Sequence, residues 1–534
     1  MSLLPEPARE ARPLGGGDVQ AVVVGAGFSG IGAAIRLRQE GWRDLVVLEK
    51  ASQLGGTWRE NTYPGCACDV PSSLYSYYFT PDARWSRIFA GQREIHDYLR
   101  TTADRYGVGE VLRCGVRVVK ARWDQNTGRW LVQTTDGEYR ARVLVLATGP
   151  WHEPRRLDVP GLDEFPGPVF HTAEWDHSVD LTGRRVAVVG SGASAVQLVP
   201  AIEDRAAAVH LFQRTPQWLL PKPDLRVPEA INWGLDRIPG VRRTLRAGQY
   251  GLQEGLGFVL RHPQLAGPVQ AAAQAHLRLT VRDPELRRAL TPDYRLGCKR
   301  LLTSSTFYPA LVQPHVHLHS TAVSSVRGQH LIGADGTAIE ADVVITATGF
   351  RVGELPLARS LHGTDGRTLH ETWAGDGPQA YLGTSVTGFP NLFLLLGPNL
   401  LSGSTSAISV LEAQLAYLAA ALRHLRRQGH ASMDVRPAVQ AAYNTAVQEA
   451  LRTTVYNAGG CSSYYFHSSG RNTFCWPWST ARLTRSLHRF DAAAYTCRTP
   501  STPAPVPTPR AAAEGSFPAD PPPLGGGGSQ AVIP

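Results

Sequence analysis

The chain has 534 residues, seven cysteines and a formal net charge of +9 at pH 7, which is enough for two or three domains with substantial cores. The apolar runs are too short to cross a bilayer, and the arginines are scattered along the chain, so we expect neither a membrane nor a nucleic acid as partner. No signal peptide is visible, and an odd cysteine count without framework spacing fits a reducing compartment. We therefore expect a cytoplasmic protein.

The first predicted element is a strand that runs into a glycine-rich loop. An apolar run at residues 20–24 is followed by an apolar helix to about residue 40 and by a strand over residues 44–48 that ends in Glu49. The loop glycines are Gly25, Gly27 and Gly30. Such glycines allow a tight turn and close approach of the backbone to a pyrophosphate, which the helix N-terminus also binds, and the acid accepts from ribose hydroxyls. This order predicts a dinucleotide site.

A second unit of the same kind begins with a strand at residues 185–189. Its loop contains Gly190, Gly192, Ala193 and Ser194. The following strand, residues 209–212, ends in Gln213 and Arg214 rather than in an acid. An arginine can pair with a 2′-phosphate that an acid would repel. The first site is therefore predicted to bind FAD, and the second NADPH.

These units predict an α/β protein with two Rossmann-like dinucleotide-binding domains and a helical insertion. The expected boundaries are a flexible leader at 1–18, FAD-binding parts at 19–152 and 388–497, NADP-binding parts at 153–223 and 295–387, a helical insertion at 224–294 and a disordered tail at 498–534. The tail is rich in proline, alanine and glycine and poor in large apolar residues.

A chain with FAD and NADPH can pass a hydride from nicotinamide to flavin, and the flavin needs an electron acceptor. Cys66 and Cys68 are too close in sequence for an easy disulfide, they lack a second ligand pair for zinc, and the other cysteines are isolated. We therefore expect no metal and take molecular oxygen as the acceptor. A peroxyflavin persists only where its charge is stabilised and water is excluded. Arg300 and Asp69 are candidates for a cation and its orienting carboxylate, although the sequence alone cannot pair them.

The segment between the two glycine loops carries the pattern F-x-G-x-x-x-H-x-x-x-W-D. Its fixed positions are Phe165, Gly167, His171, Trp175 and Asp176. The pattern resembles the fingerprint of the type I Baeyer–Villiger monooxygenases, and Trp175 replaces the tyrosine typical of related flavin-containing and N-hydroxylating monooxygenases. Residues 56–69 match a second signature of that family, and Lys299–Arg300 matches a conserved pair. The resemblance covers roughly residues 19–490.

The resemblance implies an enzyme that uses NADPH and oxygen to convert a ketone to an ester or lactone through a peroxyflavin. Arg300 would stabilise the peroxyflavin and contact the nicotinamide, with Asp69 orienting it. Residues implied to bind FAD are Gly56, Thr57, Trp58, Asp69 and Tyr75, and those implied to hold NADPH are Arg214, Thr215, Lys299 and Arg300. The substrate loop would contain Ser402, Gly403 and Ser404. The oligomeric state stays open.

Two departures from the family pattern leave the native ketone undetermined. Leu400 and Leu401 replace a Thr-Gly-type continuation, and Trp478 interrupts a C-terminal W-P-G-S-T pattern; together they suggest an apolar substrate. A flavin monooxygenase that oxygenates sulfur or nitrogen is the main alternative. A disulfide reductase and a non-catalytic flavin-binding regulator are alternatives of other classes. We expect His171 and Trp175 to couple domain movement to cofactor handling, without His171 acting as a general base.

Overall fold

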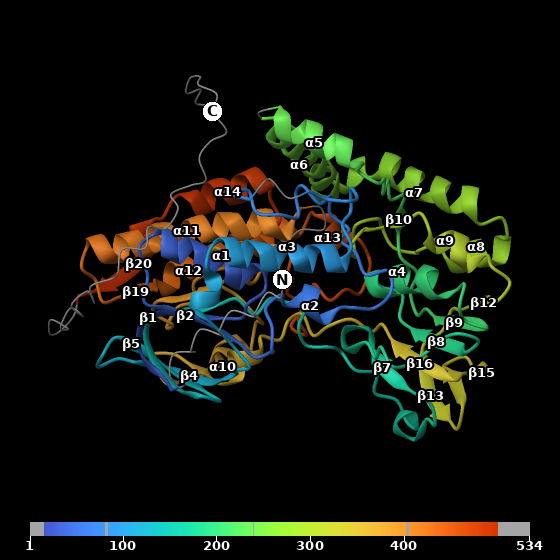
Figure 1. Cartoon of the computed structure of the whole chain (residues 1–534), viewed down its shortest axis with the longest axis horizontal. Coiled ribbons are helices and arrows are strands. Elements are labelled where there is room, and N and C mark those ends of the chain that lie inside the picture. Colours follow the sequence, from blue (N-terminus) through green and yellow to red (C-terminus); the bar gives the residue numbers. More distant parts are fainter. Residues whose placement is uncertain (1–14, 81–83, 239, 402–404, 500–534) are drawn as a thin grey trace, which may run out of the picture.

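The computed structural model describes residues 15–80, 84–238, 240–401 and 405–499. Figure 1 shows two bodies side by side, one built from the N- and C-terminal parts of the sequence and the other from its middle. We refer to them as the first and second units. Within the described ranges, no helix combines the length and apolarity needed to cross a membrane.

The first unit is built on an eight-stranded sheet. Its members are β1 (Gly17–Val24), β2 (Leu45–Glu49), β3 (Leu112–Cys114), β4 (Val118–Asp124), β5 (Arg129–Thr134), β6 (Gly137–Leu146), β17 (Leu361–His362) and β18 (Leu392–Leu394). The order is β17-β4-β5-β6-β1-β2-β3, and β18 pairs with β6. Strands β1, β2, β6 and β18 are parallel. The C-terminal halves of β1 and β6 are buried apolar runs, as expected where both faces of a parallel sheet are covered.

Helices cover the sheet of the first unit on the face seen uppermost in Figure 1. These helices are α1 (Phe28–Gln39), α3 (Gln92–Arg105), α11 (Ala407–Arg427) and α14 (Thr480–His488), and the same unit contains α2 (Thr57–Glu60), α10 (Leu369–Trp373), α12 (Pro437–Leu451), α13 (Val455–Ala458) and the hairpin β19 (Ser432–Val435) with β20 (Tyr495–Arg498). Helix α11 begins where the Ser406 hydroxyl accepts from the Ile408 N–H at 3.2 Å, an N-cap typical of serine.

The second unit has a five-stranded parallel sheet in the order β12-β9-β8-β16-β7. Its strands are β7 (Val169–His171), β8 (Arg185–Val189), β9 (Ala208–Phe212), β12 (Val316–His319) and β16 (Val343–Thr346). One face packs on α4 (Ala193–Ile202) and α9 (Phe307–Leu311), and the other on a small antiparallel sheet of β13 (Val323–Arg327), β14 (His330–Gly333) and β15 (Ala338–Glu340). The α/β class with two Rossmann-like units is thereby confirmed.

A helical arm leaves the second unit after the short strand β10 (Leu219–Leu220), which pairs with β11 (Leu302–Thr303). The arm contains α5 (Glu229–Arg237), α6 (Val241–Arg261), α7 (Gly267–Thr280) and α8 (Pro284–Ala289), and it extends above the first unit in Figure 1. Arg246 of α6 binds Glu412 of α11 at 3.1 Å. The predicted helical character of this region is therefore correct, and the arm also contacts the first unit.

The fingerprint segment forms the edge of the second sheet rather than only a connection. Its residues 169–171 are β7, which pairs with β16. A Cβ at Gly167 would lie 2.2 Å from the carbonyl oxygen of Asp342, so only glycine fits the approach of these two chains. Phe165 is buried in the core on that face of the sheet. The segment is thus held by packing within the second unit.

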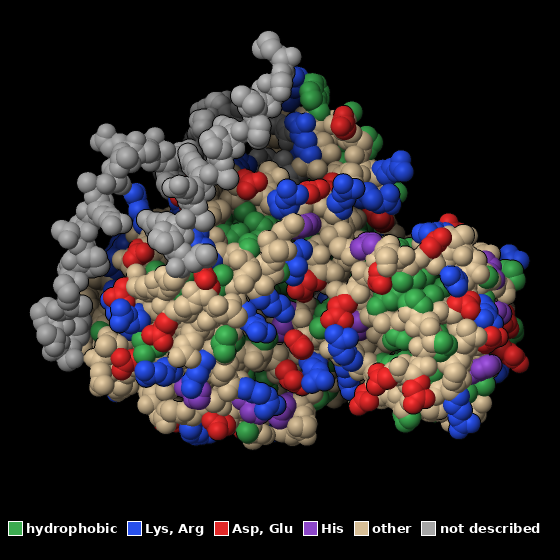
Figure 2. All heavy atoms as spheres, turned by 60° about the horizontal axis from the view of Figure 1, so that its bottom comes forward, with side chains coloured by type: hydrophobic (Ala, Val, Ile, Leu, Met, Phe, Trp, Pro, Cys, Tyr) green, Lys and Arg blue, Asp and Glu red, His purple; other side chains and the backbone are tan. Residues whose placement is uncertain are grey.

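The prediction that the remaining cysteines stand apart is wrong for one pair, because Cys298 and Cys461 form a disulfide. They are 163 residues apart, and such a distance in sequence carries no spacing signal. The other five cysteines are free thiols. Figure 2 shows Lys and Arg side chains interspersed with Asp and Glu on the visible face, as the scattered arginines of the sequence suggest.

Candidate active site

The first glycine loop has the geometry of a dinucleotide cradle. Gly25 has φ +102°, and a Cβ there would lie 2.7 Å from the Ala147 carbonyl oxygen. Gly27 caps α1, and a Cβ at Gly56 would lie 3.0 Å from the Gly27 Cα. The Glu49 carboxylate accepts from the Ala26 N–H at 2.8 Å. The loop, the second signature and the acid therefore meet at the N-terminus of α1, an arrangement that fits a bound pyrophosphate and ribose.

The aromatic residues expected beside the flavin lie together next to this loop. The Trp58 indole N–H donates to the Tyr75 hydroxyl at 3.2 Å, and the two rings meet edge to face with centroids 5.5 Å apart. Phe28, in the first turn of α1, contacts Tyr75 with centroids 5.2 Å apart. The Thr57 hydroxyl donates to the Trp151 carbonyl at 3.1 Å. These contacts join the second signature to the glycine loop.

The second glycine loop repeats this geometry in the second unit. Gly190 has φ +126°, and a Cβ there would lie 2.3 Å from the Ala347 carbonyl oxygen. A Cβ at Gly192 would meet nothing within 4 Å, so the N-terminus of α4, where Ser194 lies, has open space before it. The Ser191 hydroxyl donates to the Thr215 carbonyl at 2.7 Å. The loop is thereby joined to the chain that leaves β9.

Arg214, which follows β9, and Lys299 are close enough for their positive charges to interact. Burial lowers the pKa of Lys299, and the positive charge of nearby Arg214 lowers it further. The Lys299 ammonium also lies 5.1 Å from the centre of the Tyr294 ring. Two neighbouring cations repel each other unless an anion lies between them, and a phosphate monoester is such an anion. The pair therefore fits the 2′-phosphate of NADPH.

Asp69 and Arg300, which the sequence could not pair, face each other at the junction of the two units. The closest guanidinium nitrogen of Arg300 is 3.9 Å from Asp69 Oδ2. Burial lowers the pKa of Arg300, but the Asp69 carboxylate acts in the opposite direction, and the net pKa is raised. The arginine keeps 37% of its side chain accessible, whereas Asp69 keeps 12%. A permanent, partly accessible cation thus lies beside an enclosed carboxylate.

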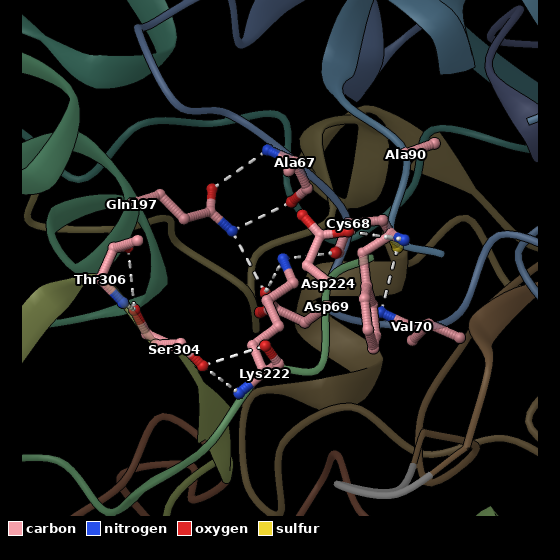
Figure 3. A network of polar contacts seen from close by, with 12 residues as sticks. Ala67, Cys68, Asp69, Val70, Ala90, Gln197, Lys222, Asp224, Ser304 and Thr306 are labelled. Carbon is pink, nitrogen blue, oxygen red and sulfur yellow. Dashed lines mark hydrogen bonds and ion pairs between the residues drawn. The ribbon is translucent and has the colours of Figure 1, made fainter. Parts of the chain in front are cut away.

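Gln197 of α4 connects the second unit to the loop that carries Asp69 (Figure 3). Its amide nitrogen donates to Asp69 Oδ1 at 3.2 Å and to the Ala67 carbonyl at 3.0 Å. Its amide oxygen accepts from the Tyr63 hydroxyl at 2.8 Å and from the Ala67 N–H at 3.3 Å. All polar atoms of the carboxamide are engaged, so this residue fixes the loop across the boundary between the units.

Lys222 brings a second cation to the same carboxylate (Figure 3). Its ammonium donates to the Cys68 carbonyl at 3.0 Å and lies 3.8 Å from Asp69 Oδ1. The backbone of Lys222 is fixed on both sides by Ser305, at 2.9 and 3.0 Å. Neither Gln197 nor Lys222 was predicted from the sequence. The signal present for Lys222 is a lysine between two prolines that directly follows an apolar run.

The thiols of Cys66 and Cys68, on either side of Ala67, are unreactive because they are buried. Burial raises the pKa of Cys66 to about 12 and the pKa of Cys68 to about 12. A thiol with such a pKa is protonated at neutral pH and is a poor nucleophile. Both cysteines are therefore small, buried residues of a packed segment.

The Cys298–Cys461 disulfide joins the segments that carry Arg300 and Tyr464. The two segments pack closely, because a Cβ at Gly459 would lie 2.5 Å from the Cys298 Cβ. The Arg295 N–H donates to the Gly459 carbonyl at 3.0 Å. The disulfide is enclosed by apolar side chains that include Tyr465. The disulfide therefore links these two segments covalently, two residues away from Arg300.

A small cavity of about 50 Å³ lies beside the C-terminal ends of β6 and β18 of the first unit, lined mainly by apolar side chains. Its lining includes Pro150, Leu355, Leu401, Tyr464 and Phe474. Leu400, by contrast, is fully buried in the core of the first unit, so it does not face this cavity.

Trp478, the other predicted substrate-side residue, packs against Trp476 with ring centroids 4.9 Å apart. The predicted substrate loop, Ser402 to Ser404, lies outside the described residues.

The fingerprint residues lie at the edge of the second sheet, and their contacts are local. His171 is buried, its Nδ1 accepts from the Ala173 N–H at 3.1 Å, and burial lowers its pKa to about 4. Trp175 packs on Phe170 with centroids 5.1 Å apart, and the Asp176 carboxylate accepts from the Ser178 N–H at 2.9 Å. The Nδ1 lone pair of His171 is thus engaged within its own segment, and the lowered pKa makes the ring a weak base. Its proposed part in domain movement stays a prediction.

Known proteins share both the sequence pattern and this architecture. A family model described as pyridine nucleotide-disulphide oxidoreductase matches residues 22–231. The chain is 47% identical over 479 residues to a Baeyer-Villiger monooxygenase of Streptomyces coelicolor, covering 89% of this chain and 92% of that protein. An oxidized steroid monooxygenase bound to NADP superposes with a TM-score of 0.80 at 29% sequence identity, and the match covers 90% of this chain and 99% of that one. A complex of OTEMO with FAD and NADP superposes with a TM-score of 0.79 at 26% sequence identity, and the match again covers 90% of this chain and 99% of that one.

Proposed function

The chain belongs to the family of Baeyer–Villiger monooxygenases, and we propose that Asp69 and Arg300 form the centre of its active site. The enzyme uses FAD and NADPH and converts a ketone to an ester or lactone with molecular oxygen. The observation that carries the proposal is the position of the Asp69–Arg300 pair at the junction of the two glycine-loop units.

Gly25, Gly27 and Glu49 of the first loop would hold FAD, with Trp58 and Tyr75 beside its ring system. Arg214 and Lys299 would hold the 2′-phosphate of NADPH at the second loop, with Thr215 beside them. Bound FAD supplies the redox chemistry, because it accepts a hydride from NADPH and then reacts with oxygen. These roles rest on the loop geometry and on the neighbouring cations described above.

Arg300 provides a charge that is present at every physiological pH, since its pKa is raised. Its guanidinium would offer preorganised donors to negative charge that develops on oxygen and to a bound nicotinamide, and such donors lower the barrier. Asp69 holds that guanidinium in place. Gln197 and Lys222 in turn hold Asp69, at 3.2 and 3.8 Å. The pair thus works as a fixed dipole rather than as a proton relay.

The substrate is proposed to be an apolar ketone. Support comes from the cavity at the ends of β6 and β18, whose lining includes Leu355, Leu401 and Phe474. Leu401 therefore faces this cavity, whereas Leu400 supports the core. A cytoplasmic location also stays a prediction, and the Cys298–Cys461 disulfide does not support it, because such bonds are rare in reducing compartments.

The test is product identification with purified enzyme, NADPH, oxygen and a panel of cyclic, linear and aryl ketones. Esters or lactones from apolar ketones are expected, and Arg300→Ala is expected to keep FAD and the reduction of flavin by NADPH while losing ester formation. Arg351→Ala, on an exposed arginine that pairs with Glu354, is the matched control. Oxygenation of sulfides or amines alone would instead support the sulfur- or nitrogen-oxygenating alternative. Ketone oxygenation by Arg300→Ala at the wild-type rate would contradict the proposed centre.

A further inference from the structure

Three side chains that can bind a metal ion meet at the far end of the first unit. His424 lies in the last turn of α11, His430 follows that helix, and Cys497 lies in β20. One ligand atom from each residue lies within 4.8 Å of the other two. Figure 1 shows β19 and β20 at the opposite end of the first unit from α2 and α4. The cluster is therefore separate from the Asp69–Arg300 site.

The backbone around this cluster is fixed by hydrogen bonds. The His430 N–H donates to the Leu425 carbonyl at 3.1 Å, and the Arg142 guanidinium donates to the His430 carbonyl oxygen. Cys497 stands opposite Met433 in the β19–β20 ladder. Because the three side chains start from anchored backbone positions, bringing their ligand atoms onto one ion requires only rotation of side chains.

One ring nitrogen of a histidine in the cluster is buried without a partner. His430 Nδ1 is inaccessible to solvent and has no hydrogen-bond partner among the residues that the structure describes. A buried nitrogen without a partner costs roughly 1–3 kcal/mol, and such atoms are rare in folded proteins. A metal ion would use the lone pair that is otherwise unsatisfied. This observation is independent of the convergence of the three residues.

The ligand types select the ion. Two imidazole nitrogens and one thiolate form a borderline-soft set that suits Zn²⁺ and does not suit Mg²⁺ or Ca²⁺, which prefer oxygen ligands. We propose that His424, His430 and Cys497 bind one Zn²⁺ ion, with water in the fourth position. On binding, the Cys497 thiol releases its proton to solvent, and the thiolate offsets one charge of the ion beside Arg142. This proposal revises the expectation that the chain holds no metal.

The position of the site indicates a structural role. The ion would join the end of α11 to the β19–β20 hairpin. That hairpin is bound to the chain before β18, because the Asn391 N–H donates to the Met433 carbonyl at 3.0 Å and the Met433 N–H donates to Asn391 Oδ1 at 2.9 Å. Zinc is therefore expected to stabilise the first unit rather than to take part in oxygenation.

The experiment uses the full-length flavoprotein. Elemental analysis after purification without chelator is expected to give about one zinc per chain. After chelator treatment, Co²⁺ is expected to produce visible d–d absorption bands at wavelengths longer than flavin absorption, and Zn²⁺ is expected to abolish them. Zinc should also raise the Tm, since a ligand that binds only the folded state stabilises it.

The matched variants are Cys497→Ser and Cys114→Ser, because both cysteines are free thiols on short strands and both are partly buried. Cys114→Ser is expected to keep the cobalt bands, and Cys497→Ser to lose them. If Cys497→Ser fails to fold, His424→Ala at the end of α11 is expected to weaken metal binding at least tenfold. Absence of the bands in the wild-type protein, or their persistence in both Cys497→Ser and His424→Ala, would overturn the proposal.

Discussion

The carboxamide of Gln197 and the carboxylate of Asp69 are joined by a hydrogen bond of 3.2 Å across the boundary between the two nucleotide-binding units. Gln197 belongs to α4, the helix that begins at the second glycine loop, and Asp69 belongs to the second signature of the first unit. A shift of α4 relative to the first unit would therefore act directly on Asp69, the carboxylate proposed to orient Arg300.

Gln197→Leu removes this connection without a large change in side-chain volume. It leaves the Tyr63 hydroxyl without its acceptor and Asp69 without one donor, so we expect the kcat of ketone oxygenation to fall about tenfold, which corresponds to about 1.4 kcal/mol. Because Arg300 is then less well positioned, a larger share of the NADPH consumed should end as hydrogen peroxide. The measurement is ester formed per NADPH consumed. Gln313→Leu, on an exposed glutamine after α9, should leave the ratio unchanged.

Lys222 allows its charge and its hydrogen bond to be tested separately. Lys222→Gln keeps a donor for the Cys68 carbonyl but removes the positive charge near Asp69, and Lys222→Met removes both. The pair is largely enclosed, where charges interact more strongly than at the surface. We therefore expect both variants to lose oxygenation rate by about tenfold, while FAD stays bound. Wild-type activity of Lys222→Gln would assign the lysine a purely structural role on the Cys68 carbonyl.

Arg214→Ala tests the assignment of the second nucleotide. One charged hydrogen bond is typically worth about 1.5–3 kcal/mol, so kcat/KM for NADPH should fall roughly 10- to 150-fold. The value for NADH should stay within about threefold, because NADH lacks the 2′-phosphate. Steady-state rates of flavin reduction, measured with NADPH and with NADH, give the two kcat/KM values and their ratio. Arg205→Ala, on an exposed arginine of the same unit that pairs with Asp180 at 2.9 Å, is the control. An unchanged preference for NADPH in Arg214→Ala would refute the assignment.

Local patterns allowed the nucleotide units to be predicted, because each strand, glycine loop and helix occupies a continuous stretch. The boundaries of β8 and β9 follow the apolar runs closely. The contacts of Asp69 could not be predicted in the same way. Gln197, Lys222 and Arg300 reach this carboxylate from separate elements, and each looks like an ordinary polar residue in its own segment. The same limitation hid the Cys298–Cys461 disulfide, since only the fold brings its partners together.

The disulfide predicts a specific thiol count. Of the seven cysteines in the sequence, five are free, so denatured, unreduced protein should react with five equivalents of a thiol reagent and reduced protein with seven. Reduction by dithiothreitol, or Cys461→Ser, should lower the free energy of unfolding by about 2–5 kcal/mol, because a long loop is no longer closed in the unfolded chain. Cys114→Ser should leave stability within about 0.5 kcal/mol. Seven reactive thiols without reduction would show that the tether does not form.

His171 makes the stability of the second unit depend on pH in a defined direction. Its pKa is lowered from an ordinary 6.5 to about 4 because the ring is buried, so the unfolded chain binds a proton between these values and the folded chain does not. The contribution of His171 to stability is therefore complete above pH 6.5 and is lost as the pH falls towards 4, at up to about 1.4 kcal/mol per pH unit. Acid thus favours the unfolded state at this residue.

His171→Asn isolates this effect, because the asparagine oxygen can still accept from the Ala173 N–H but cannot take up a proton in this range. Urea unfolding at pH 7.5 and pH 5.5 is expected to show that the wild-type protein loses about 1 kcal/mol more than the variant between the two conditions. His330→Asn, on an exposed histidine of β14, should keep the wild-type difference. Equal losses in the wild type and in His171→Asn would mean that His171 is as free to protonate in the folded protein as in the unfolded chain.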